Sequence, residues 1–171
     1  MARIPLITDR EANLSPEQAE TFDWVVATRG SMVRPFEVLL HSPELAMRVA
    51  ELGAKIRFDS SLRDHDRELA ILTTARAHGC EFEWDSHLPH ARRAGVREEV
   101  LDHLCDGGGS LTDSESLFIG FVRELCARTK VSPELFERAE AVVGVAGVVE
   151  LSATVGYYTM MAMVMGACDA C

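Results

Sequence analysis

The stretch CEFEWDSH, from Cys80 to His87, follows Gly79 and begins a predicted helix. It places a thiol, a carboxylate and an imidazole at Cys80, Glu83 and His87, a spacing of i, i+3 and i+7. Each residue of an α-helix turns by about 100°, so these side chains share one face within about 60°. Groups of this kind can donate a proton, accept a proton and shift one another's pKa. The spacing therefore indicates proton-transfer chemistry.

Glu83 and His87 stand four residues apart, close enough for a hydrogen bond along the helix. If Glu83 faces inward among its aromatic neighbours, desolvation should raise its pKa and make it a usable acid or base. The alternative is a solvated glutamate and a surface or capping histidine. We assign Glu81 and Asp85, which fall on other faces of the helix, to solvent.

Cys80 is expected in the first turn, where the positive end of the helix dipole favours a thiolate. The alternative is a small buried apolar residue. Glu68 precedes Cys80 by twelve residues, on the predicted helix before it, and periodicity cannot show whether it reaches the cluster. Glu83 and His87 with Cys80 would supply three metal ligands, but no His-Glu-x-x-His or paired CxxC set is present. We predict neither a metal nor a cofactor.

Length, net charge and cysteine count limit the classes of protein to which this chain can belong. A chain of 171 residues predicts one domain over 1–171. A net charge of −10 without a dense basic patch argues against nucleic acid as a partner. Five cysteines, an odd number, favour a reduced, cytoplasmic setting, and we expect no signal peptide. The Met-rich residues 151–167 favour a core or subunit-interface helix over a membrane span.

Helix signals recur along the whole chain, and they predict an all-α fold. Ser15 with Gln18 and Thr112 with Glu115 have capping-box spacing. We expect Pro89 to kink or split its helix. The valines of residues 142–149 suit either a strand or a close-packed helix. The predicted helices lie around 16–29, 43–58, 64–78, 80–94, 97–105 and 113–128, with two more from 133 onward.

These motifs resemble the carboxymuconolactone decarboxylase family, which includes alkyl hydroperoxidase D. The resemblance implies an all-helical fold of antiparallel helical hairpins and a homo-oligomer, either a trimer or a hexamer. It covers about residues 33–167. The segments that carry it are Arg67–Leu72, Gly79–Trp84 with His87, and Ala94–Val96, flanked by Leu39–Leu45 and Gly156–Met160.

The two branches of that family imply different chemistry. The hydroperoxidase branch has a CxxC, a histidine four residues after it, and a glutamate twelve residues before it. Glu68, Cys80 and His87 match this pattern, but Glu83 replaces the peroxide-attacking cysteine. A glutamate cannot form a sulfenic acid or a disulfide, so Cys80 would need another thiol, such as Cys168 or Cys171. The decarboxylase branch uses acid–base groups and needs no thiol pair.

Our first hypothesis is a cofactor-free lyase or isomerase acting on a small carboxylated lactone or a related enolisable acid. His87 would stabilise an oxyanion or supply a proton, Glu83 would shuttle the proton at carbon, and Glu68 would orient His87. Cys80 would donate a hydrogen bond or pack. The second hypothesis is a thiol-dependent antioxidant protein, similar to an alkyl hydroperoxide reductase, that uses Cys80. The third is a non-catalytic oligomerisation module, which predicts that the cluster residues are exposed and separate, with no enclosed pocket. We predict a small-molecule substrate and no nucleic-acid or membrane partner.

Overall fold

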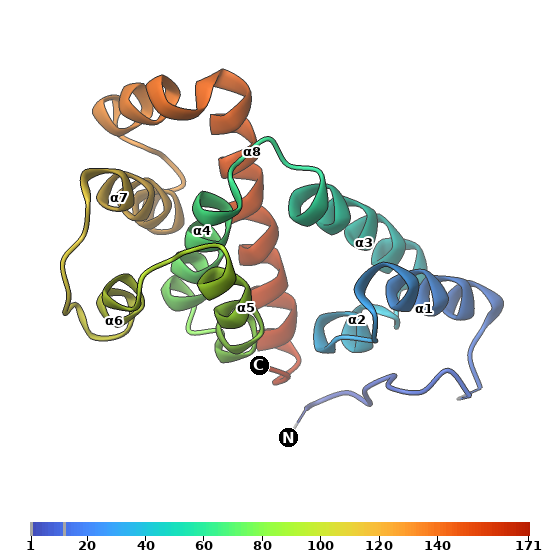
Figure 1. The fold of residues 1–171 in the computed structure, drawn as a ribbon. Coiled ribbons are helices and arrows are strands. Elements are labelled where there is room, and N and C mark those ends of the chain that lie inside the picture. Colours follow the sequence, from blue (N-terminus) through green and yellow to red (C-terminus); the bar gives the residue numbers. More distant parts are fainter. Residues whose placement is uncertain (1, 12) are drawn as a thin grey trace. The chain divides into compact units, whose positions relative to one another are not determined.

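A computed structural model describes residues 2–11 and 13–171, and within these residues every regular element is a helix (Figure 1). The all-α prediction is confirmed. The helices are α1 (Pro16–Arg29), α2 (Arg34–Leu39), α3 (Pro43–Phe58), α4 (Asp64–Ala77), α5 (Glu81–Arg93), α6 (Glu98–Asp106), α7 (Asp113–Arg128) and α8 (Pro133–Ala167).

Local signals explain where several helices begin and end. Ser15 and Thr112 each accept a hydrogen bond from the backbone three residues on, and both predicted capping boxes form. α5 runs from Glu81 to Arg93 without being split at Pro89. α2 was not predicted from the sequence. It has six residues, and its N-cap, Val33, makes no side-chain capping bond.

The backbone leaves helical geometry inside α8 at Gly144, with φ 70° and ψ 173°. Two helical pieces therefore follow Pro133, as predicted, and the valines of residues 142–149 are helical rather than extended. Within the described residues, α8 alone is long and apolar enough to cross a membrane by length and composition, and 33% of its apolar window is buried in protein. Core helices of folded proteins meet the same criteria.

The chain forms two compact units. The terminal unit comprises Met1–Asp59 and Met163–Cys171, and the central unit comprises Ser60–Ala162. In the terminal unit, α1 and α2 both pack against α3. The core of that unit includes Phe22, Val25, Phe36 and Leu40, each at most 7% exposed.

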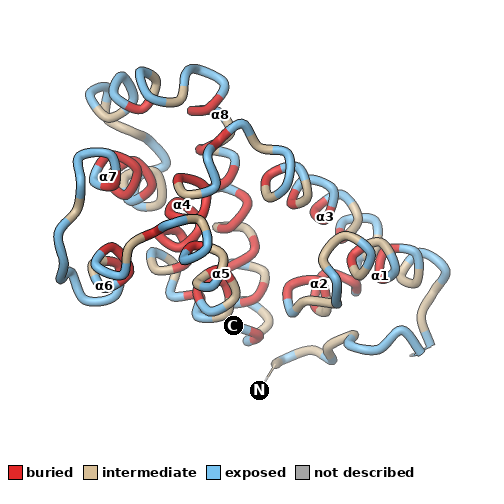
Figure 2. The backbone as a smooth tube through the Cα atoms, viewed as in Figure 1, coloured by how far each residue is buried: buried red, intermediate tan, exposed pale blue. Residues whose placement is uncertain are grey.

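In the central unit, α4 packs against α5, α6 and α7. Residues 66–75 of α4 are all buried, and the helix is marked as buried along most of its length in Figure 2. The core around it includes Leu69, Leu72, Phe118, Phe121 and Leu151. Because a helix buried on all sides must pair its polar groups, the buried charged residues of α4 (Asp66, Arg67 and Glu68) need partners inside the protein.

Candidate active site

A tight hairpin sets α4 against α5. α4 ends at Ala77, and Gly79 two residues later has a φ of 61°, in the left-handed region that glycine adopts without strain. The Cys80 N–H donates to the Ala75 carbonyl at 2.9 Å, and the Gly79 N–H donates to the Arg76 carbonyl at 3.2 Å. This Schellman pattern reverses the chain within three residues, so α5 returns alongside α4.

The hairpin brings Glu68 of α4 to His87 of α5. The Nδ1 atom of His87 lies 2.8 Å from Oε2 of Glu68, in a buried hydrogen bond. A carboxylate oxygen accepts, so Nδ1 carries the ring proton whenever Glu68 is ionised. Nε2 is then the nitrogen left for further proton exchange.

Two groups face Nε2 of His87. The Tyr158 hydroxyl, from α8, lies 3.1 Å away, and Oε2 of Glu83 lies 3.8 Å away. When the imidazole is neutral, the Tyr158 hydroxyl donates to Nε2; when it is charged, Nε2–H can donate to the Tyr158 oxygen, and the imidazolium forms an ion pair with the Glu83 carboxylate. The rings of His87 and Tyr158 meet edge-on, with centroids 5.1 Å apart.

The cluster is almost fully removed from water. The exposed fractions of Glu68, Glu83, His87 and Tyr158 are 4%, 5%, 4% and 3%. Two carboxylates in such a place require nearby positive charge. His87 can supply one positive charge, and Arg67, 8% exposed with Nε 3.8 Å from Oε1 of Glu68, supplies another.

The structure agrees with the prediction of which carboxylates of α5 face solvent. Glu83 is buried, whereas Glu81 and Asp85 are exposed. Glu68, which periodicity could not place, lies in the cluster through its bond to His87.

Cys80 lies one residue before the first turn in which we expected it, as the N-cap of α5. It is 1% exposed, and its side chain makes no capping bond. Among the described residues, no disulfide joins any of the five cysteines, Cys168 and Cys171 included. The N-cap position keeps Cys80 beside the positive end of α5, as the sequence suggested for a thiolate.

Tyr158 is the cluster residue that sequence reasoning missed. Its contact with His87 spans 71 residues, so no local spacing could reveal it. Its segment was noted only as a flank of the family resemblance. The available signal was physical: a tyrosine on an apolar helix that becomes buried needs a partner for its hydroxyl.

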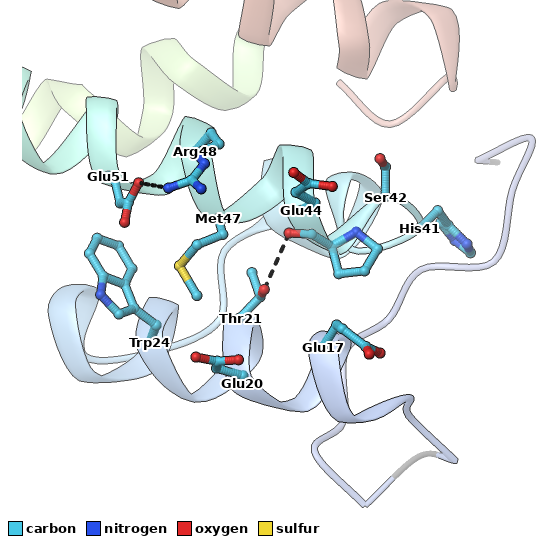
Figure 3. Close-up of a pocket in the computed structure, with 11 residues that line it drawn as sticks. Glu17, Glu20, Thr21, Trp24, His41, Ser42, Glu44, Met47, Arg48 and Glu51 are labelled. Atoms are coloured by element: carbon cyan, nitrogen blue, oxygen red, sulfur yellow. Dashed lines mark hydrogen bonds and ion pairs between the residues drawn. The ribbon is translucent and has the colours of Figure 1, made fainter.

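A separate hollow lies in the terminal unit between α1 and α3 (Figure 3). It has a volume of about 840 Å³, and its lining includes Trp24, Met47 and four glutamates. One of those glutamates, Glu51, is ion-paired with Arg48 at 3.2 Å. None of the site residues predicted from the sequence lines this hollow. Across residues 2–11 and 13–171, no three His, Cys, Asp or Glu side chains are grouped so that they could hold a metal.

Comparison with known proteins identifies the segment that holds the cluster. The model of the carboxymuconolactone decarboxylase family matches residues 43–116. This segment is carboxymuconolactone decarboxylase family sequence. It contains Glu68, Cys80, Glu83 and His87, and the resemblance noted from the sequence is confirmed. A search of curated proteins finds no match.

Solved structures give the same fold. The debrominase Bmp8 in its apo form aligns with a TM-score of 0.75 and 14% identity, covering 98% of this chain and 91% of that one. A Bmp8 variant in which a cysteine is replaced by alanine, in complex with 2,3,4-tribromopyrrole, aligns with a TM-score of 0.76 and 14% identity. The alignment covers 100% of this chain and 93% of that chain. The chain therefore has the same fold as these structures.

Proposed function

We propose that the protein is a cofactor-free lyase or isomerase that acts by acid–base chemistry on a small carboxylated lactone or a related enolisable acid. The observation that carries the proposal is the buried imidazole of His87, bonded to Glu68 on one nitrogen and facing Glu83 and Tyr158 on the other. A buried cluster of one base, two carboxylates and a phenol provides the proton donors and acceptors for enolate chemistry.

In this mechanism the substrate loses CO₂, and the electron pair of the broken C–C bond moves into the conjugated carbonyl to give a dienolate. His87, as imidazolium, donates from Nε2 to the developing oxyanion. Tyr158 provides a second O–H donor near the same nitrogen. Glu83 in its acid form delivers one proton to carbon, and solvent restores that proton. The net reaction replaces a carboxylate by hydrogen and releases CO₂.

Glu68 has a different role, because its contact is with Nδ1 of His87. It fixes the tautomer and ring orientation and stabilises the imidazolium. The third hypothesis, a non-catalytic oligomerisation module, predicted cluster residues that are exposed and separate. Their burial and mutual contacts favour an enzyme instead.

The proposal is tested by measuring CO₂ release from carboxymuconolactone by the wild-type protein and by His87→Asn. We expect release by the wild type and a loss of about 10²–10⁴-fold in the variant. His103→Asn is the matched control, because the His103 ring bonds the Gly108 carbonyl instead. Equal rates in wild type and His87→Asn would remove His87 from the chemistry.

A second candidate is thiol chemistry at Cys80, favoured by its place at the positive end of α5 and by the structural similarity to a debrominase. Reductive removal of bromine would consume two external thiols: the carbon–bromine bond becomes carbon–hydrogen, and bromide and a disulfide are released. Peroxide reduction would need the same external thiols, because Glu83 stands where the family has its second cysteine. Bromide release from a bromopyrrole, or peroxide consumption, that vanishes in Cys80→Ser would favour this candidate over the lyase.

A further inference from the structure

Arg67 is a buried cation with an unused donor. The residue is 8% exposed, and its Nε atom is buried without a hydrogen-bond partner. Its Nη2 atom lies 3.0 Å from Oδ1 of Asp64, whose own side chain is 76% exposed. A guanidinium that keeps one N–H unbonded inside a protein carries a desolvation penalty, so its position calls for a reason.

A carboxylate of the His87 cluster lies close to that donor. Nε of Arg67 lies 3.8 Å from Oε1 of Glu68. A bridging water would need about 4.5 Å or more between the two atoms, given hydrogen bonds of about 2.8 Å. The contact is therefore a direct ion pair, slightly longer than a hydrogen bond.

Glu68 thus has one oxygen for each of two partners. Oε1 faces the fixed positive charge of Arg67, and Oε2 accepts from Nδ1 of His87 at 2.8 Å. Arginine does not lose its proton, so its charge acts on Glu68 at every relevant pH.

We propose that Arg67 is a positioning residue whose fixed positive charge lowers the proton affinity of the Glu68–His87 pair. The inference rests on the proposed function for its catalytic meaning, but not for its test. Arg67 favours the carboxylate form of Glu68 and opposes a second positive charge on the imidazole. The other groups that face His87 are Glu83 and His90 on α5 and Tyr158 on α8.

Removing the positive charge should make the Glu68–His87 pair hold its proton to higher pH. The imidazole nitrogens of His87 can be followed by ¹⁵N NMR across a pH titration, with the signal assigned from the spectrum of His87→Asn. In Arg67→Met we expect the titration of His87 to move up by about one pH unit, because a positive charge that opposes the imidazolium is removed. Arg67→Lys, which keeps the charge, should titrate close to the wild type.

Arg92→Met is the matched control. It removes the same positive charge, but Arg92 lies on the surface, where it pairs with Glu98. It should leave the His87 titration unchanged. If Arg67→Met does not fold, Arg67→Gln repeats the test with a polar side chain of lower volume. A folded Arg67→Met or Arg67→Gln protein whose His87 titrates as in the wild type would overturn the inference. The readout needs no substrate, so it stands or falls separately from the lyase activity.

Discussion

Each ring nitrogen of His87 lies within hydrogen-bond distance of one side chain: Glu68 at Nδ1 and Tyr158 at Nε2. Tyr158 is the neutral partner at Nε2, 3.1 Å away. We predict that Tyr158→Phe lowers turnover by about 10²-fold, because one donor near the oxyanion is lost. The free energy of unfolding should fall by only about 1 kcal/mol, since the ring remains buried. Steady-state kinetics and chemical denaturation measure the two effects.

Tyr157→Phe is the matched control for this prediction. Tyr157 is also buried, at 5% exposed, and its ring meets that of Tyr158 edge-on. No bond to His87 is lost in that variant, so turnover should stay near the wild-type value. If both variants lose activity equally, the loss comes from packing around α8 rather than from the Tyr158 hydroxyl.

For single residues, helix periodicity grouped the side chains that share one helix, the family resemblance added Glu68, and Tyr158 was missed. Glu83 and His87 are four residues apart, and helix periodicity alone places them together. Glu68 and Tyr158 reach the same imidazole across separations of 19 and 71 residues. Only the tertiary packing of α4, α5 and α8 decides those contacts.

Among the helices, the N-terminus of α7 contains a pH-sensitive contact. Glu115 closes the capping box with Thr112 and also bonds Arg97 at 2.7 Å. The Arg97 guanidinium, with the Thr112 bonds, lowers the pKa of Glu115 from 4.5 to about 2. This stabilisation is fully present above pH 4.5 and is lost as the pH falls towards 2.

We therefore predict that Glu115→Gln is less stable than the wild type at neutral pH by about 2 kcal/mol, after allowance for the partial exposure of Arg97. Glutamine still fits the capping box, so the helix start is kept. The difference in unfolding free energy should shrink between pH 4.5 and pH 2, where the wild-type carboxylate becomes protonated. Urea denaturation at several pH values measures it. A difference that is constant with pH would contradict the assignment.

The break in α8 depends on Gly144, because φ 70° and ψ 173° lie in a region that is almost restricted to glycine. We predict that Gly144→Ala destabilises the protein by about 1–3 kcal/mol through backbone strain alone, since a Cβ there would meet nothing within 4 Å. Gly156, on the same helix, also has open space around it. Gly156→Ala should be neutral or stabilising by up to about 1 kcal/mol. Thermal or chemical unfolding measures the change in stability of each variant. Equal changes in Gly144→Ala and Gly156→Ala would exclude backbone strain at Gly144.

Helix boundaries followed closely from the sequence where capping chemistry is strong, as at Ser15 and Thr112. The sequence did not predict α2, a short helix that has no side-chain cap. Cys80 was placed one residue too far into its helix, because the spacing of side chains fixes a face but not the first hydrogen-bonded residue.

For the whole molecule, the family resemblance predicts a homo-oligomer, either a trimer or a hexamer. Three valines of α8, Val142, Val145 and Val149, are 52%, 63% and 63% exposed, and such side chains are common in subunit contacts. Sedimentation velocity should give a mass three or six times 18.8 kDa. A monomer at micromolar concentration would contradict this prediction, and it would leave the account of the His87 cluster unchanged, because Glu68, Glu83, His87 and Tyr158 all belong to the central unit.

The central claim is that Glu83, buried one helical turn before His87, is the group that moves a proton at carbon. It is tested most directly by the rate of solvent deuterium incorporation into the decarboxylated lactone, with Glu83→Gln compared with Glu81→Gln. Glu81 lies two residues away on the same helix, is exposed, and pairs with Arg76. We predict a loss of about 10²–10⁴-fold in Glu83→Gln and no change in Glu81→Gln. Equal rates in Glu83→Gln and the wild type would contradict the account.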